Sequence, residues 1–325
     1  MRQCLVTVLL SVLGAGMGLP EAASTGAAAR PLAIATNTIL ADLTARVAGE
    51  RWEVYSLLPP GADPHGFEPT PRDARHLAAA RAVILVGGGY ETPALVRMIR
   101  SAASRAKVVS MEPLLTAWDH PKPGTGEGGG QGDDGGGQGD EAGEVDPHFW
   151  TSVPAVIRAV ELIRDGLAQA DPEGAQAYRH AARAYIERLQ ELDAWVREQV
   201  AQIPPSRRIL VTNHDTLRYF AREYGFTVEG SLIPSVSPLA EPSAADVARL
   251  LRRLGELPVP AIFVETTLSP ALARRVAQET GARVVVLYTD SLGEPGSGAH
   301  TYEEYVRTNV QRIVQALGGV RTEER

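Results

Sequence analysis

Short apolar runs alternate with amphipathic stretches along most of the chain. The runs are rich in Val, Ile and Leu, a composition typical of buried strands. The stretches between them carry apolar residues three and four positions apart, as helices that cover a sheet do. The expected strands lie at 31–36, 52–59, 81–88, 106–111, 207–213, 260–267 and 282–290. The expected helices lie at 72–80, 92–103, 152–170, 243–255 and 269–281. This alternation predicts an α/β fold with parallel-type sheets flanked by helices.

One amphipathic stretch is much longer than the others. It begins after Asp171-Pro172, a favourable helix start, and ends at Pro204-Pro205. A helix of about 30 residues is roughly 45 Å long, comparable to a whole domain. We therefore expect two α/β lobes joined by one rigid connecting helix. The predicted segments are a first lobe at 30–170, the connecting helix at 171–203 and a second lobe at 204–325.

The first 29 residues read as a signal peptide. One early arginine is followed by an apolar run that is too short for a membrane anchor. No cysteine stands at the end of this run, where a lipoprotein signal would place it, so we expect an exported periplasmic protein without a lipid anchor. The single cysteine, Cys4, lies inside the signal. Any metal site of the mature chain must then use nitrogen and oxygen donors.

Composition narrows the choice of partners. The net charge of −7 offers no basic surface for nucleic acid or anionic lipid. Residues 119–145 form a Gly-rich acidic loop with almost no apolar side chains, which cannot fold into a core of its own.

Histidines and carboxylates cluster where strands are expected to end. His214, Glu265 and Asp290 each follow an apolar run, and the tripeptide Asp-Pro-His occurs twice, ending at His65 and His148. Ligands of open parallel sheets bind beyond the carboxyl ends of the strands. Each residue alone also fits a solvated turn. Together, three imidazoles and a carboxylate indicate a site for a divalent transition metal.

Six motifs, in order, resemble the metal-binding solute-binding proteins of bacterial ABC importers. They are DPHGFEPTPRD, DPHFWTSVPAV, VTNHDTLRYFAREYGF, SVSPLAEPSAADVARL, FVETTLSP and LYTDSLGEPGSGAHTYEEYVRTNV. This zinc and manganese receptor family, cluster A-I, has two α/β lobes and a long connecting helix. The resemblance covers almost all of the mature chain.

The resemblance implies a metal site of His65, His148, His214 and Asp290. Histidine at the third position points to zinc as the cargo, with manganese or iron as the alternative. The implied partners are an ABC permease and, as a further candidate, a periplasmic zinc-donor protein, with the receptor itself a monomer. Three other side chains are expected to support the ligands or, for the first of them, to replace Asp290: Glu265, Glu241 and Asn213.

The chain departs from the family pattern at two places. The loop before the second ligand lacks the histidines that zinc receptors often carry there, and Asn213 stands where small residues are common.

Two rival functions stay open, and the first is a zinc hydrolase. A zinc hydrolase would need an open coordination position and a general base, and the sequence has no His-Glu-x-x-His pair. An adhesin that merely retains a metal is the other rival. We therefore expect a transport receptor and not an enzyme.

The acidic loop gives a first prediction. Flexible oxygen donors bind transition metals far more weakly than preorganised imidazoles. Deleting residues 124–143 is therefore expected to leave the equilibrium metal affinity unchanged, as measured by competitive titration. Loss of tight binding would show that the loop supplies part of the site. A slower transfer of metal from a donor protein would identify the loop as a weak reservoir, and an unchanged rate would identify it as a spacer.

Overall fold

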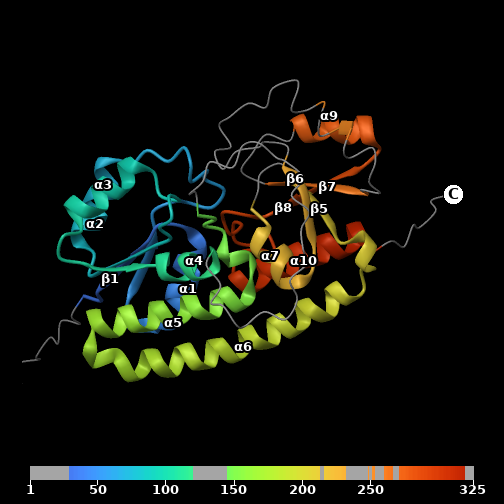
Figure 1. Ribbon diagram of the computed structural model, residues 1–325. Helices are drawn as coiled ribbons and strands as arrows, with labels where there is room; N and C mark the ends of the chain where they lie inside the picture. The colour runs from blue at the N-terminus through green and yellow to red at the C-terminus, as the bar shows by residue number, and fades with distance from the viewer. Residues whose placement is uncertain are drawn as a thin grey trace, which may run out of the picture.

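The computed structural model contains two parallel four-stranded sheets (Figure 1). It describes residues 29–119, 145–212, 216–231, 248, 251–252, 260–265 and 271–318. The first sheet has the order β2-β1-β3-β4 and comprises β1 (Leu32–Ala35), β2 (Glu53–Ser56), β3 (Ala82–Leu85) and β4 (Lys107–Ser110). The second has the order β6-β5-β7-β8 and comprises β5 (Ile209–Thr212), β6 (Thr227–Ser231), β7 (Ala261–Glu265) and β8 (Arg283–Leu287). The predicted α/β class is confirmed.

Helices flank both sheets. Those of the first half are α1 (Thr38–Ala48), α2 (Pro71–Ala79), α3 (Pro93–Ala102), α4 (Glu112–Asp119) and α5 (Val153–Ala170). The remaining described helices are α6 (Ala175–Ala201), α7 (Arg218–Tyr224), α9 (Ala271–Thr280) and α10 (Tyr302–Leu317). Within the part of the chain that the structure describes, no helix has both the length and the apolar character that a membrane span requires.

Side-chain caps fix where several helices begin. Asn37 accepts a hydrogen bond from Leu40 N and starts α1 directly after β1. Ser152 does the same for α5, which carries Pro154 in its first turn. Such caps satisfy backbone N–H groups that have no partner inside the helix. They therefore help to fix the residues at which α1 and α5 begin.

The connecting helix α6 runs beneath both sheets (Figure 1). It has 27 residues and starts at Ala175, because Pro172–Gly174 form a 3-10 turn before it. Trp52 Nε1 donates to Tyr178 Oη at 2.7 Å, and Tyr178 donates to Asp171, so the first turn is tied to the first half of the chain. Its buried face carries residues three and four positions apart, as expected for an amphipathic helix: Tyr178, Ala182, Tyr185, Leu189, Leu192, Val196 and Val200.

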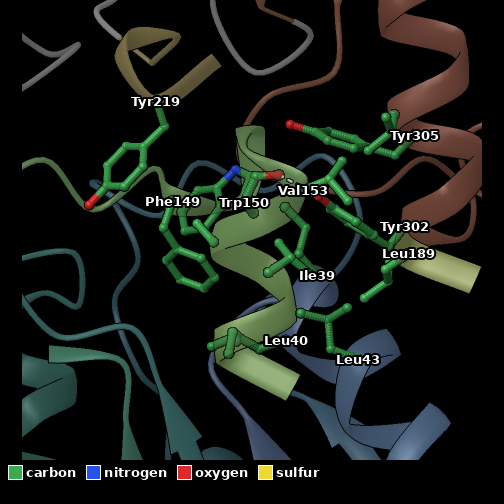
Figure 2. Packing of buried hydrophobic residues seen from close by; sticks show 14 of the residues in the cluster. Ile39, Leu40, Leu43, Phe149, Trp150, Val153, Leu189, Tyr219, Tyr302 and Tyr305 are labelled. Atoms are coloured by element: carbon green, nitrogen blue, oxygen red, sulfur yellow. Dashed lines mark hydrogen bonds between the residues drawn. The ribbon is translucent and has the colours of Figure 1, made fainter. Parts of the chain in front are cut away.

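One core cluster of buried apolar side chains extends through both halves of the chain. It includes Ile39 and Leu43 of α1, Leu189 of α6, and Tyr302 and Tyr305 of α10 (Figure 2). A smaller second cluster fills the space between the first sheet and helices α2 and α3. The two sheets are therefore connected by a shared interior as well as by the long helix.

Several elements differ from expectation. Strand β6 was not predicted, because Glu229 and Gly230 interrupt its apolar pattern and its register with β5 shifts midway. Helices α1, α4, α7 and α10 were not predicted either. The helix expected at 243–255, the signal peptide and the acidic loop fall almost entirely outside the described residues.

Close packing of α5 on β4 gives a stability prediction. A Cβ atom on Gly166 would lie 2.2 Å from Val109 Cγ2. Replacing glycine by alanine inside a helix normally stabilises by up to about 1 kcal/mol. Here Gly166→Ala is expected to destabilise by about 1–3 kcal/mol because the methyl group overpacks the interface. Thermal or denaturant unfolding measures the change.

Val109→Ala provides the control, because it removes the clashing methyl groups. In the double variant, Gly166→Ala is expected to cost less than it does alone. A rise in the melting temperature of the single variant would contradict the close contact.

Candidate metal centre

Three of the four predicted ligands converge in the structure. His65 lies in the loop between β2 and α2, His148 directly precedes the 3-10 turn Phe149–Thr151, and Asp290 follows β8. One ligand atom from each lies within 4.8 Å of those of the other two. His148 and Asp290 are buried, and His65 is half-buried. Residues far apart in sequence therefore form one compact group of nitrogen and oxygen donors.

Three predicted site residues lie outside the described residues. They are His214, Asn213 and Glu241. Thr212, the last described residue before His214, ends β5 in a buried position. Its role as a ligand stays a prediction.

Both Asp-Pro-His tripeptides form the same local turn. Asp63 Oδ1 accepts a hydrogen bond from His65 N at 2.9 Å, and Asp146 Oδ1 accepts one from His148 N at 2.9 Å. The intervening proline fixes a backbone dihedral angle, and the aspartate closes the turn. The repeated motif thus presents each imidazole from a restrained backbone, which lowers the entropy lost when a metal binds.

Asp146 has a second role that the sequence analysis missed. Its Oδ1 atom also accepts a hydrogen bond from His148 Nδ1 at 2.7 Å. This bond leaves His148 Nε2 facing Asp290, whose Oδ1 lies 3.3 Å away. A carboxylate behind a histidine fixes the orientation and tautomer of the ring and raises its basicity. The aspartate two positions before the histidine was the available sequence signal.

The electrostatic state of His148 follows from these neighbours. Burial disfavours the imidazolium, yet the carboxylates of Asp146 and Asp290 outweigh it and raise the pKa of His148 from 6.5 to about 10. A proton on Nε2 therefore occupies the position where a cation would interact with His148 and Asp290. Proton and metal compete for the same atom.

Aromatic rings line the site on the side of the first sheet. The Trp150 ring lies 5.5 Å from that of His148, and the Tyr90 ring lies 6.3 Å from that of His65. Asn37, the cap of α1, donates from Nδ2 to the Tyr90 hydroxyl at 3.1 Å. These buried rings exclude water, which strengthens electrostatic interactions inside the site.

Glu91 is a buried carboxylate that the sequence analysis did not single out. It accepts hydrogen bonds from Thr36 Oγ1 at 2.7 Å, Val86 N at 2.7 Å and Gly87 N at 2.8 Å. Burial raises its pKa, although these donors partly offset the effect. Glu91 thereby connects the end of β1 to the turn after β3, next to Tyr90.

Glu265, predicted to support a ligand, ends β7 and is buried. Its Oε1 accepts a hydrogen bond from Thr216 Oγ1 at 3.1 Å. Thr216 is the first described residue after His214 and lies two positions from it in the sequence. The expected role of Glu265, to support a ligand or to replace Asp290, stays a prediction.

The remaining described histidines lie elsewhere. His76 is half-buried with its ring 4.5 Å from that of Tyr55, and His180 and His300 are exposed. Across the described ranges, His65, His148 and Asp290 are the one group that could hold a metal ion through three or more side chains.

Sequence comparison identifies the family. The pattern of the zinc-uptake complex component A, periplasmic, matches residues 34–316. The chain belongs to this family. Its members are the metal solute-binding proteins of ABC importers, so the cargo class is zinc or manganese and the partner class is an ABC permease. The family consists of transport receptors, which confirms the prediction that the chain is not an enzyme.

Individual relatives differ in the metal that they are named for. The manganese-binding lipoprotein MntA of Halalkalibacterium halodurans is 33% identical over 96% of this chain and 97% of its own length. MntA of Bacillus subtilis is 32% identical over 98% and 100%. The solved structure of the periplasmic zinc-binding protein TroA from Treponema pallidum has a TM-score of 0.76 and 27% identity, with 89% of this chain and 99% of TroA covered.

These relatives bear on two predictions. The zinc assignment is confirmed only as far as zinc or manganese. The family is extracytoplasmic, as expected, but several relatives are named lipoproteins. The absence of a lipid anchor therefore stays a prediction.

The bond from His148 to Asp146 gives a testable prediction. Asp146→Ala removes the acceptor that orients the ring while leaving His65, His148 and Asp290 in place. Metal affinity is expected to fall about 10- to 100-fold, the usual effect of losing such a partner. Competitive titration with a chelator measures it. Asp63→Ala is the matched control. It removes the hydrogen bond that closes the turn at His65 N, whereas Asp146→Ala removes both the turn bond at His148 N and the bond to the His148 ring. Equal losses in both variants would show that only the turn matters.

The pH dependence of metal binding follows from the pKa of His148. Because the pKa is raised in the folded, metal-free protein, the imidazolium stabilises that state. This contribution is fully present below 6.5 and is lost as the pH rises through about 10. The rise in melting temperature on metal addition is therefore expected to grow as the pH rises toward about 10, and to vanish in acid as protons displace the metal.

Calorimetric unfolding with and without metal across this range makes the comparison. A metal-dependent shift that stays constant down to about pH 4.5 would contradict imidazole ligation.

Proposed function

We propose that this chain captures Mn²⁺ outside the cytoplasm and delivers it to an ABC permease, with His65, His148, His214 and Asp290 as ligands. The observation that carries the proposal is the convergence of two histidines and one aspartate from three separate elements, with donor atoms within 4.8 Å. A buried carboxylate 3.3 Å from an imidazole nitrogen suits a shared cation.

Manganese is favoured over zinc by the relatives. Both MntA proteins, named for manganese, are more than 30% identical to this chain over nearly its whole length. The zinc expectation rested on a histidine at position 214, and such a ligand set is compatible with either ion. Imidazole and carboxylate donors serve zinc and manganese alike.

Zinc remains the second candidate. It is supported by the likeness to TroA and by the expected three-imidazole ligand set. Nitrogen and oxygen sites generally bind Zn²⁺ more tightly than Mn²⁺. Tight zinc binding in vitro would therefore not identify the cargo. The metal that the cell accumulates through this receptor decides it.

The proposal also covers the domain organisation of the chain, its oligomeric state and its export. The two lobes, residues 30–170 and 204–325, act around the connecting segment 171–203, and the receptor works as a monomer. Export by a cleaved signal without a lipid anchor belongs to the same proposal, as does a periplasmic donor protein that supplies the metal.

The ligand set is tested by alanine substitution. His148→Ala and His65→Ala are each expected to weaken Mn²⁺ and Zn²⁺ binding by orders of magnitude, because each removes a direct donor. His180→Ala is the matched control, since His180 is exposed on α6. Isothermal titration of the purified proteins measures the change. Wild-type affinity in the His148→Ala protein would refute the assignment.

The cargo is tested in cells. Deleting the gene is expected to lower cellular manganese under manganese limitation while leaving zinc unchanged, as measured by elemental analysis. Complementation with the wild-type chain restores manganese, and complementation with His148→Ala does not. A selective loss of zinc would favour the second candidate.

A further inference from the structure

The backbone carbonyl of Thr289 links two metal-ligand segments. It accepts a hydrogen bond from Trp150 Nε1 at 2.8 Å and a second from the Tyr305 hydroxyl at 3.1 Å. Trp150 lies two positions after His148, and Thr289 directly precedes Asp290. The side chains of Trp150, Thr289 and Tyr305 are all buried. Figure 2 shows Tyr305 extending from α10 toward the start of α5, where Trp150 lies.

The residue on the other side of Asp290 is held as well. Ser291 Oγ accepts a hydrogen bond from Gly61 N at 2.8 Å, in the loop that leads to His65. Leu292 N donates to Thr38 Oγ1 at 2.8 Å, at the start of α1. The segment that carries Asp290 is therefore fixed by the first half of the chain on both sides of the carboxylate.

The tryptophan itself is fixed in turn. Its carbonyl accepts a hydrogen bond from the Tyr302 hydroxyl at 2.9 Å. Its ring packs edge-on against Tyr90 and Phe149, with centroid distances of 5.4 and 5.3 Å. A ring held in this way cannot reorient without disturbing α10 and the His65 side of the site. Its N–H group is thus a rigid reference point for Thr289.

We infer that Trp150 is a positioning residue for metal binding, and that it holds Asp290 at the distance from His148 that a shared cation requires. Ser291 acts as the second anchor of the same segment. Binding sites tolerate displacements of only about 0.5 Å before affinity falls, so ligands on loops need such supports. The inference rests on the proposed function, because it takes the ion to lie between His148 and Asp290.

Three variants separate the contacts. Trp150→Phe keeps an aromatic ring but removes the N–H donor. Tyr305→Phe removes the second donor to Thr289, and Ser291→Ala removes the acceptor for Gly61, each with the loss of a single hydroxyl group. Tyr185→Phe is the control, because its buried hydroxyl on α6 makes no hydrogen bond with any described residue. If Trp150→Phe folds poorly, the other two variants still test the inference.

Two measurements distinguish positioning from general stability. The first is Mn²⁺ and Zn²⁺ affinity by chelator competition, compared with the melting temperature of each metal-free variant. The second is the visible absorption spectrum of the Co²⁺-loaded protein, which reports the geometry of the ligands. The variants are expected to lose about 10- to 100-fold in affinity and to shift the Co²⁺ spectrum, whereas Tyr185→Phe does neither.

A double variant completes the test. If Trp150 and Tyr305 both act through the Thr289 carbonyl, the losses from Trp150→Phe and Tyr305→Phe are expected to be non-additive. Affinity and spectrum equal to those of Tyr185→Phe in all variants, with only the melting temperature lowered, would overturn the inference while the proposed function stands. A wild-type protein that binds none of these ions would overturn both.

Discussion

The metal site depends on the hydrogen bond between His148 Nδ1 and Asp146. Without metal, His148 lies between two carboxylates in a buried setting where an unpaired charge would be very unfavourable. Asp146 fixes which nitrogen of the ring faces Asp290, and so determines that Nε2 is the atom available to a cation. The same aspartate closes the turn before His148, which couples the backbone conformation to the orientation of the ring. One carboxylate thereby sets both the position and the chemistry of a ligand.

The rest of the fold supplies the rigidity that this arrangement needs. Parallel sheets place the loops after β2 and β8 at their carboxyl ends, where His65 and Asp290 lie. Helices α1, α5, α6 and α10 share one buried core beneath the site, so the two halves of the chain are held together near the ligands. The Asp290 segment is bonded to Trp150, Gly61 and Thr38, all in the first half. A receptor built in this way holds its ligands close together before the ion arrives, which reduces the entropy lost on binding.

Much of this could be predicted from the sequence. Apolar periodicity located seven of the eight described strands and the buried face of α6, because strand and helix periods differ clearly in those segments. It missed β6, where Glu229 and Gly230 break the pattern and pairing with β5 decides the conformation. It also missed that α1 and α10 pack between the halves, since helix contacts depend on tertiary arrangement.

Some residues of the candidate metal site could be predicted from the sequence, and others could not. Motif order and strand ends indicated His65, His148 and Asp290, and the structure brings their donor atoms together. The roles of Asp146, Trp150 and Glu91 could not be predicted, because they depend on distances between side chains and backbone groups that no spacing along the chain specifies. Metal choice is equally hidden, since manganese and zinc accept the same donors and differ in coordination geometry.

His65, His148 and Asp290 are expected to bind one divalent ion together. A crystal structure of the loaded protein, with anomalous scattering recorded at the absorption edges of manganese and zinc, would locate this ion. We expect a single strong peak among these three side chains, with the ion bonded to His148 Nε2 at about 2.0 Å if it is zinc. A peak at any other position, with His148 Nε2 still 3.3 Å from Asp290 Oδ1, would refute the assignment.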